Sequence, residues 1–321
     1  GRMTYFSSRA AFEASLRTVP AISGTAATRA KIRQDSLTKP PGSLGRLEEI
    51  AIFMAGWQET ERPQVKHGQA IIFAGNHGVA RHGVSAYPAE TTALMVENFH
   101  RGGAAINALT AAAGLSLKIV PLRLETPTAD FTVAPAMDGD ACLEALNAGA
   151  AAIDAQTDLL ILGEMGIGNS TSAAAISAHL FGGEIARWAG RGTGIDDAGL
   201  ERKRDMVARA LARHHDAPRN AFETLARLGG RETAAIAGAI LAARQRRIPV
   251  ILDGFICCSA VAALAADAPE ITAHCLAGHC SAEPGHRLML AKLGLAPLLD
   301  IGMRLGEGSG AAGAAQLIMA A

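Results

Sequence analysis

The sequence has 321 residues, which suits either one large domain or a large domain with a small one. Its 30 Lys and Arg residues are matched by 30 Asp and Glu residues, so the formal charge of zero gives no general attraction to nucleic acid or anionic membranes. The longest nearly unbroken apolar run, residues 234–243, is too short to cross a bilayer, and the N-terminal segment lacks a signal-peptide pattern. Five cysteines, an odd number, favour reduced thiols, so we expect a cytoplasmic protein without nucleic-acid or membrane partners.

Along the chain, a helical segment precedes an alternation of apolar runs and Ala-rich stretches. Residues 3–65 carry an amphipathic helical pattern and are predicted to form a small helical subdomain, with the C-terminal helix as a candidate addition; residues 66–321 form the large domain. The predicted strands are residues 69–74, 117–122, 159–162, 250–252, 273–277 and 298–303, and the helical stretches include residues 91–113, 172–179, 200–214, 232–246 and 281–293. Apolar runs without polar alternation are typical of parallel strands that are buried on both faces. The pattern predicts an α/β fold with an open, mostly parallel, Rossmann-like sheet, helices on both faces and a smaller helical domain.

Polar, glycine-rich segments follow these strands, where open parallel sheets bind their ligands. The segment after the first strand contains Gly75-Asn76-His77-Gly78 and then residues 83–88. The segment after the third strand reads GEMGIGNSTS, residues 163–172, and opens a helix. Its glycines allow the backbone to approach an anion, and a helix start can hold phosphate. The alternative is that residues 169–171 merely cap the helix.

Two further segments offer groups for an anion. Residues 190–197, GRGTGIDD, precede a helix that carries Lys203; the alternative is a surface loop with a solvated lysine. Ser281 follows the fifth strand and supplies a hydroxyl at a helix start, where an N-cap role is the alternative.

The last glycine-rich segment, residues 304–313, reads RLGEGSGAAG. Glu307 stands between Gly306 and Gly308, where side-chain packing offers it little, so we predict that it faces a ligand; the alternative is a first-turn residue that complements the helix dipole. Residues 308–313 also match G-x-G-x-x-G, the dinucleotide fingerprint, but the sequence lacks the acidic residue expected about 20 positions later. An NAD-dependent oxidoreductase therefore stands as an alternative function.

A zinc site is one interpretation of the histidines and cysteines at residues 274, 275, 279 and 280. Neighbouring residues of a strand point to opposite faces of the sheet, so they suit tetrahedral coordination poorly. We therefore favour core packing for these side chains, and we predict no metal and no cofactor.

Several segments together resemble the nicotinate-nucleotide–dimethylbenzimidazole phosphoribosyltransferase family. They are LTKPPGSLGRLE at residues 37–48, the Asn76-His-Gly loop, residues 98–104, residues 163–172, LDGF at residues 252–255, and RLGEGSGA at residues 304–311. The resemblance implies transfer of the phosphoribosyl group of nicotinate mononucleotide to 5,6-dimethylbenzimidazole or a related base, giving α-ribazole 5′-phosphate and nicotinate in cobalamin nucleotide-loop assembly. It also implies a homodimer. A nucleotide-sensing protein without catalytic activity is the non-enzymatic alternative.

The resemblance assigns roles to residues of this sequence. Glu307 is implied as the base that takes the benzimidazole proton, and Glu164 as a second catalytic carboxylate near the ribose. The stretch that contains Ser85 and Met95 is expected to border the benzimidazole. The substrate-binding residues expected are Gly166, Gly168, Asn169, Ser170, Gly192, Gly194, Lys203, Ser281, Arg304, Leu305, Gly306, Ser85, Tyr87 and Met95.

Overall fold

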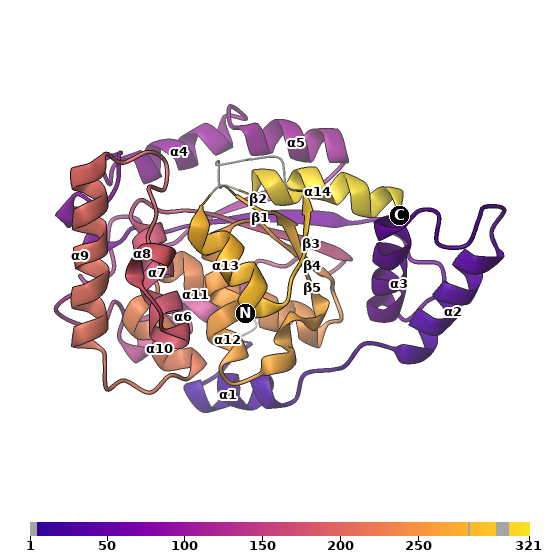
Figure 1. Ribbon diagram of the computed structural model, residues 1–321, viewed down its shortest axis with the longest axis horizontal. Coiled ribbons are helices and arrows are strands. Elements are labelled where there is room, and N and C mark those ends of the chain that lie inside the picture. Colours follow the sequence, from indigo (N-terminus) through magenta and orange to yellow (C-terminus); the bar gives the residue numbers. More distant parts are fainter. Residues whose placement is uncertain (1–4, 282, 300–307) are drawn as a thin grey trace.

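The computed structural model describes residues 5–281, 283–299 and 308–321 (Figure 1). Its described strands form one parallel sheet in the order β2-β1-β3-β4-β5-β6. The strands are β1 Gly68–Ala74, β2 Ser116–Pro121, β3 Leu159–Met165, β4 Val250–Leu252, β5 Cys275–His279 and β6 Pro297–Leu299. Each predicted apolar run contributes a strand, although β5 lies two residues later than predicted and the end of the last run lies outside the described residues.

Helices cover both faces of this sheet. They are α1 Arg9–Arg17, α2 Gly24–Ser36, α3 Arg46–Gln58, α4 Thr91–His100, α5 Ala105–Ala113, α6 Gly139–Ala151, α7 Asn169–Phe181, α8 Ile185–Trp188, α9 Asp197–Arg213, α10 Ala221–Leu228, α11 Arg231–Gln245, α12 Phe255–Ala265, α13 Pro284–Leu293 and α14 Ser309–Ala320, with short 3-10 helices η1 Gly78–His82 and η2 Pro269–His274. Figure 1 shows α5 and α14 above the sheet, with α6, α11 and α12 below it.

The pleat of β3 explains why both faces are covered. Leu160 and Leu162 pack in the core shared with α11 and α12, whereas Leu159 and Ile161 pack in the core shared with α3, α5 and α14. Successive side chains of a strand point to opposite faces, so an uninterrupted apolar strand needs an apolar partner layer on each side. The predicted α/β fold with an open parallel sheet and helices on both faces is confirmed.

Four of the predicted helices differ from the structure by three residues or more. The helix predicted at residues 200–214 begins earlier, at Asp197, and the one predicted at residues 281–293 begins later, at Pro284. The stretch 91–113 is two helices, because the chain turns at Gly102, whose φ of +79° favours glycine, and Asn107 then accepts a hydrogen bond from the backbone N–H of Ala104 at the start of α5. The helix predicted at residues 172–179 begins earlier, at Asn169, directly after Gly168 with a φ of +91°.

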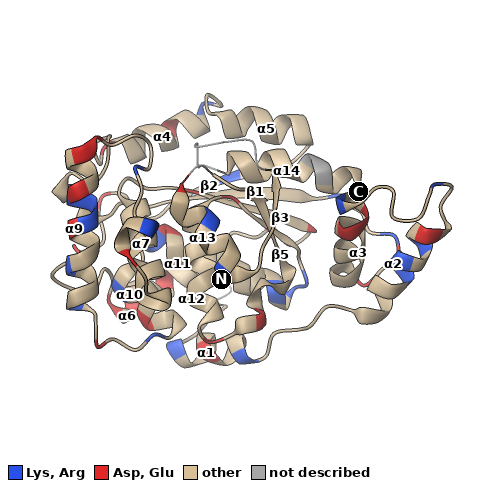
Figure 2. Ribbon diagram, viewed as in Figure 1, with Lys and Arg blue, Asp and Glu red and all other residues tan. Residues whose placement is uncertain are grey.

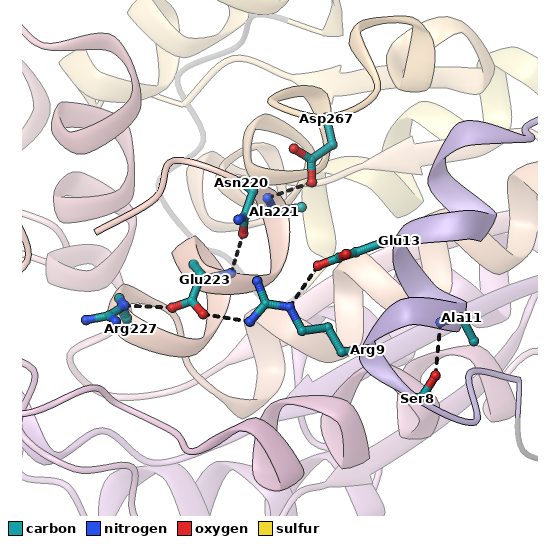
Figure 3. A network of polar contacts seen from close by, with 9 residues as sticks. All are labelled: Ser8, Arg9, Ala11, Glu13, Asn220, Ala221, Glu223, Arg227 and Asp267. Atoms are coloured by element: carbon teal, nitrogen blue, oxygen red, sulfur yellow. Dashed lines mark hydrogen bonds and ion pairs between the residues drawn. The ribbon is translucent and has the colours of Figure 1, made fainter. Parts of the chain in front are cut away.

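The N-terminal helices attach at two places. On α1, the guanidinium of Arg9 lies 2.6 Å from the carboxylate of Glu223 in α10 (Figure 3). The ring of Phe12, also on α1, packs against Phe222. Helices α2 and α3 pack against each other, and Trp57 of α3 donates its indole N–H to the carbonyl of Ala273 at 3.0 Å. The division at residue 65 remains a prediction.

Charged side chains of both signs are interspersed on outer helices such as α2 and α9, whereas the strands are mostly uncharged (Figure 2). Over the described part of the chain, no helix has both the length and the apolar character that a membrane span requires. The mixture of positive and negative side chains on these helices agrees with the equal numbers of basic and acidic residues in the sequence.

Candidate active site

The sheet order places a crevice at the carboxyl ends of β1 and β3. β1 has β2 on one side and β3 on the other, so successive crossovers diverge in opposite directions from this point. Open α/β sheets bind ligands at such a switch point. A cavity of about 720 Å³ lies here, and residues that follow β1, β3, β4 and β5 line its wall.

Every predicted site residue in the described part of the chain lines this one cavity. They are Ser85, Tyr87, Met95, Glu164, Gly166, Gly168, Asn169, Ser170, Gly192, Gly194, Lys203 and Ser281. The other predicted site residues, Arg304, Leu305, Gly306 and Glu307, lie outside the described residues. The structure thus brings together segments that are far apart in the sequence, as expected for a ligand site at the carboxyl ends of the strands.

The end of β3, which extends three residues beyond the predicted strand, holds a buried carboxylate. Glu164 is 6% exposed, and its Oε1 accepts a hydrogen bond from the side-chain amide of Asn169 at 3.0 Å. The N-cap of α7 is Gly168, which has no side chain to cap with. The interpretation of residues 169–171 as simple cap residues is therefore wrong, because Asn169 orients Glu164 instead.

Lys203 of α9 is buried beside the first turn of α7. Its ammonium group donates to the hydroxyl of Ser170 and to the carbonyl of Gly190, both at 2.8 Å, and the residue is 1% exposed. Burial lowers the pKa of Lys203 to about 8, against a smaller opposing effect of Glu283. A solvated surface lysine is therefore the wrong interpretation. An ammonium group only donates hydrogen bonds, so Ser170 accepts this one and keeps its own hydroxyl proton for another partner.

Ser281 lies across the cavity, after β5. Its backbone N–H donates to Nδ1 of His286 at 2.9 Å, and its hydroxyl oxygen lies 2.9 Å from the same nitrogen. Helix α13 begins at Pro284 with Glu283 as N-cap and has no side-chain cap. The N-cap interpretation of Ser281 is wrong, and its hydroxyl is paired with a buried imidazole.

Sequence reasoning missed a buried pair behind the cavity wall. His77 lies 2.8 Å from Glu232, and both side chains are almost fully buried. A Cβ atom at Gly166 would overlap the carboxylate of Glu232, and one at Gly230 would overlap both members of the pair. The glycines therefore leave room for this pair. The Asn76-His-Gly motif and the Gly229-Gly230 pair were visible signals, but no local pattern joins residues so distant in the sequence.

A second missed residue, Asp253 at the end of β4, anchors the start of α14. Its buried carboxylate accepts the backbone N–H groups of Gly308 at 3.0 Å and Ala311 at 3.1 Å. Nε2 of His279 lies 3.4 Å from the same carboxylate. A Cβ atom at Gly310 would overlap the ring of His279. Packing thus accounts for glycine at this position of the apparent dinucleotide fingerprint.

The side chains considered for zinc have other surroundings. His274 is buried and makes hydrogen bonds to the carbonyls of Ile240 at 2.9 Å and Ile271 at 3.0 Å. Within residues 5–281, 283–299 and 308–321, no three His, Cys, Asp or Glu side chains are grouped so that they could hold a metal ion.

Known proteins resemble this chain over nearly its whole length. Residues 19–321 match the family DBI_PRT, described as phosphoribosyltransferase. The chain is 62% identical over 319 residues to the nicotinate-nucleotide–dimethylbenzimidazole phosphoribosyltransferase of Novosphingobium aromaticivorans, covering 99% of this chain and 94% of that protein. It is 56% identical over 312 residues to the protein of the same name from Ruegeria pomeroyi, covering 97% and 92%. Among solved structures, CobT from Thermus thermophilus has a TM-score of 0.86 and 42% identity, covering 92% of this chain and 94% of that chain.

Proposed function

The chain belongs to the nicotinate-nucleotide–dimethylbenzimidazole phosphoribosyltransferase family, and on this basis we propose how its cavity carries out the reaction. The enzyme is a pentosyltransferase of cobalamin biosynthesis. It moves the phosphoribosyl group of nicotinate mononucleotide to 5,6-dimethylbenzimidazole or a related base, giving α-ribazole 5′-phosphate and nicotinate. The observation that supports these roles most strongly is the convergence of Glu164, Lys203 and Ser281, from three separate segments, on one cavity.

The phosphate of the nucleotide is held between the first turn of α7, which carries Ser170, and the segment after β5, which carries Ser281. A phosphate at neutral pH accepts hydrogen bonds and carries close to two negative charges. Lys203 supplies a cation, and Ser170, which already accepts from Lys203, turns its own proton toward the ligand. Ser281 supplies a hydroxyl from the opposite wall. The first turn of α7 adds the positive end of a helix dipole.

The ribose lies beside Glu164. Displacement at the anomeric carbon passes through a state with oxocarbenium character, so a nearby carboxylate stabilises the developing positive charge. Asn169 fixes the carboxylate of Glu164 through the 3.0 Å hydrogen bond, so little reorganisation is needed at the transition state. Nicotinate leaves a cationic pyridinium as a neutral ring, so its departure needs no acid.

Glu307 takes the proton of the attacking base. A benzimidazole N–H becomes acidic as the opposite ring nitrogen forms its bond to the ribose, and a carboxylate within about 3 Å can then accept the proton. The residue that follows Glu307 in the sequence, Gly308, is anchored by the 3.0 Å hydrogen bond to Asp253 at the end of β4, next to the cavity-lining residues Gly254 and Phe255. This anchoring supports a base at the edge of the same cavity.

A product assay tests the function directly. The chain is incubated with nicotinate mononucleotide and 5,6-dimethylbenzimidazole, and mass spectrometry is used to look for α-ribazole 5′-phosphate and nicotinate. We expect both products in equal amounts, and neither when the base is omitted. Calorimetric binding of the mononucleotide without product would favour a sensor, and selective binding of NAD would favour an oxidoreductase.

We also propose, from the family resemblance, that the enzyme works as a cytoplasmic homodimer. The two-domain division at residue 65 is proposed from the helical pattern of residues 3–65 and supported by the packing of α2 on α3.

A further inference from the structure

The hydroxyl groups of the two cavity serines have different hydrogen-bond partners within the protein: one partner donates and the other accepts. Ser170 accepts a hydrogen bond from Lys203, which can only donate. Ser281 lies at hydrogen-bond distance from Nδ1 of His286, and the same nitrogen also accepts from the backbone N–H of Ser281. Because a backbone N–H always donates, Nδ1 of His286 is an acceptor and carries no proton.

The surroundings of His286 keep the ring neutral. The side chain is fully buried in α13, and burial lowers the pKa of His286 to about 4, with a further contribution from His279, whose ring centre is 5.6 Å away. The ring proton therefore sits on Nε2, which lies 3.8 Å from the sulfur of Cys258. The Nδ1 edge of the imidazole thus contacts Ser281, and the Nε2 edge packs against Cys258 in the core.

Of the two contacts that Ser281 makes with Nδ1 of His286, the one from the backbone N–H can remain when a ligand binds, and the one from the hydroxyl can be given up. The backbone N–H bond satisfies Nδ1 by itself, so the hydroxyl of Ser281 can rotate away without leaving a buried acceptor unpaired, which would be costly. The backbone bond meanwhile holds Ser281 at the cavity wall between β5 and α13. The hydroxyl can therefore donate its hydrogen bond to an anionic ligand instead, while the residue stays fixed.

We propose that His286 is a positioning residue for the nucleotide phosphate: its Nδ1 fixes Ser281 through the backbone N–H and accepts a hydrogen bond from the Ser281 hydroxyl whenever the phosphate is absent. The imidazole itself does not touch the substrate. This inference rests on the proposed function, because it takes the nucleotide phosphate as the ligand of Ser281.

Two substitutions of similar size separate the two edges of the ring. In His286→Asn, the side-chain oxygen can take the place of Nδ1 and keep the contact with Ser281. In His286→Gln, the longer side chain carries its amide toward the place of Nε2 and loses that contact. We expect the Gln variant to raise the calorimetric Kd and the KM for nicotinate mononucleotide about tenfold, the loss expected for one hydrogen bond to a charged-ligand site. The Asn variant stays within about threefold of the parent chain, and KM for the base changes in neither.

A third comparison tests whether His286 acts through Ser281. In a Ser281→Ala background, we expect His286→Gln to raise the Kd for the mononucleotide by less than about threefold, because the hydroxyl that it orients is gone. Equal effects of Asn and Gln, or a Gln effect that multiplies fully with that of Ser281→Ala, would overturn the inference in favour of a packing role. Thermal unfolding of each variant identifies any loss of folded protein, and if the Gln variant does not fold, the Asn variant decides: a tenfold rise in its Kd in a folded chain overturns the proposal. A parent chain that makes no product and binds no mononucleotide would instead refute the proposed function.

Discussion

Replacing Glu307 with Gln is expected to lower kcat for α-ribazole 5′-phosphate formation about a thousandfold, a typical contribution of a general base. The amide keeps the size of the side chain but cannot accept the benzimidazole proton. The nucleotide phosphate and ribose are held by other groups, so the calorimetric Kd for nicotinate mononucleotide should stay within about threefold. Steady-state rates with product detection, together with calorimetry, check both halves of this expectation.

A surface substitution serves as the matched control for this variant. Glu61 is exposed and lies in the turn after α3, away from the cavity wall, so Glu61→Gln should leave kcat unchanged. A Glu307→Gln enzyme with kcat within tenfold of the parent would remove Glu307 as the base, and another acceptor for the proton would then be needed.

Replacing Lys203 with Met is expected to raise the Kd for nicotinate mononucleotide about a hundredfold, because hydrogen bonds to charged groups are among the stronger ones. Methionine keeps the length of the side chain and fills the buried space, but it leaves both Ser170 and the phosphate without the ammonium group. Lys31 on α2 is exposed, and Lys31→Met is the control that removes one charge without touching the cavity. A change of less than threefold in the Lys203→Met variant would exclude this lysine from the phosphate site.

The lowered pKa of Lys203 gives this binding a pH dependence with a definite sign. Because its pKa in the free chain is about 8, Lys203 is charged below that pH and progressively neutral above it. Anionic phosphate favours the charged form, so affinity is greatest below pH 8 and falls as the pH rises through 8 toward 10. The Lys203→Met variant should not show this fall. Calorimetry of the parent chain and the Lys203→Met variant at pH 7 and pH 10, one value on each side of the pKa, measures the difference in their loss of affinity.

The sequence predicted the sheet because its central strands β1, β3 and β4 are mostly apolar and buried on both faces. The run at residues 159–162 has no polar alternation, and this is what a strand between two helical layers requires. Bounds were less predictable. The stretch 91–113 was predicted as one helix, although the adjacent Gly102 and Gly103 are a signal for a break, and α4 ends at His100 before Gly102 with its positive φ.

The site was predictable where chemistry and glycine occur together right after a strand. Ser281 follows β5, and Glu164 stands beside glycines at the end of β3, so both were found in this way. Lys203 was found from the glycine-rich segment that precedes α9. Their partners were not predictable, because His286 and Glu232 lie inside helical stretches and look like ordinary helix residues in the sequence. Which groups pair across the fold depends on the sheet order, and a linear pattern does not carry that order.

The proposed mechanism requires that the nucleotide lies with its phosphate between Ser170, Lys203 and Ser281 and with its sugar against Glu164. A crystal structure of the Glu307→Gln chain with nicotinate mononucleotide and 5,6-dimethylbenzimidazole tests this directly. We predict hydrogen bonds of about 3 Å from all three side chains to the phosphate, and the side chain of residue 307 within about 3 Å of a benzimidazole nitrogen. A nucleotide bound outside the cavity, or a base that lies far from residue 307, would contradict the account.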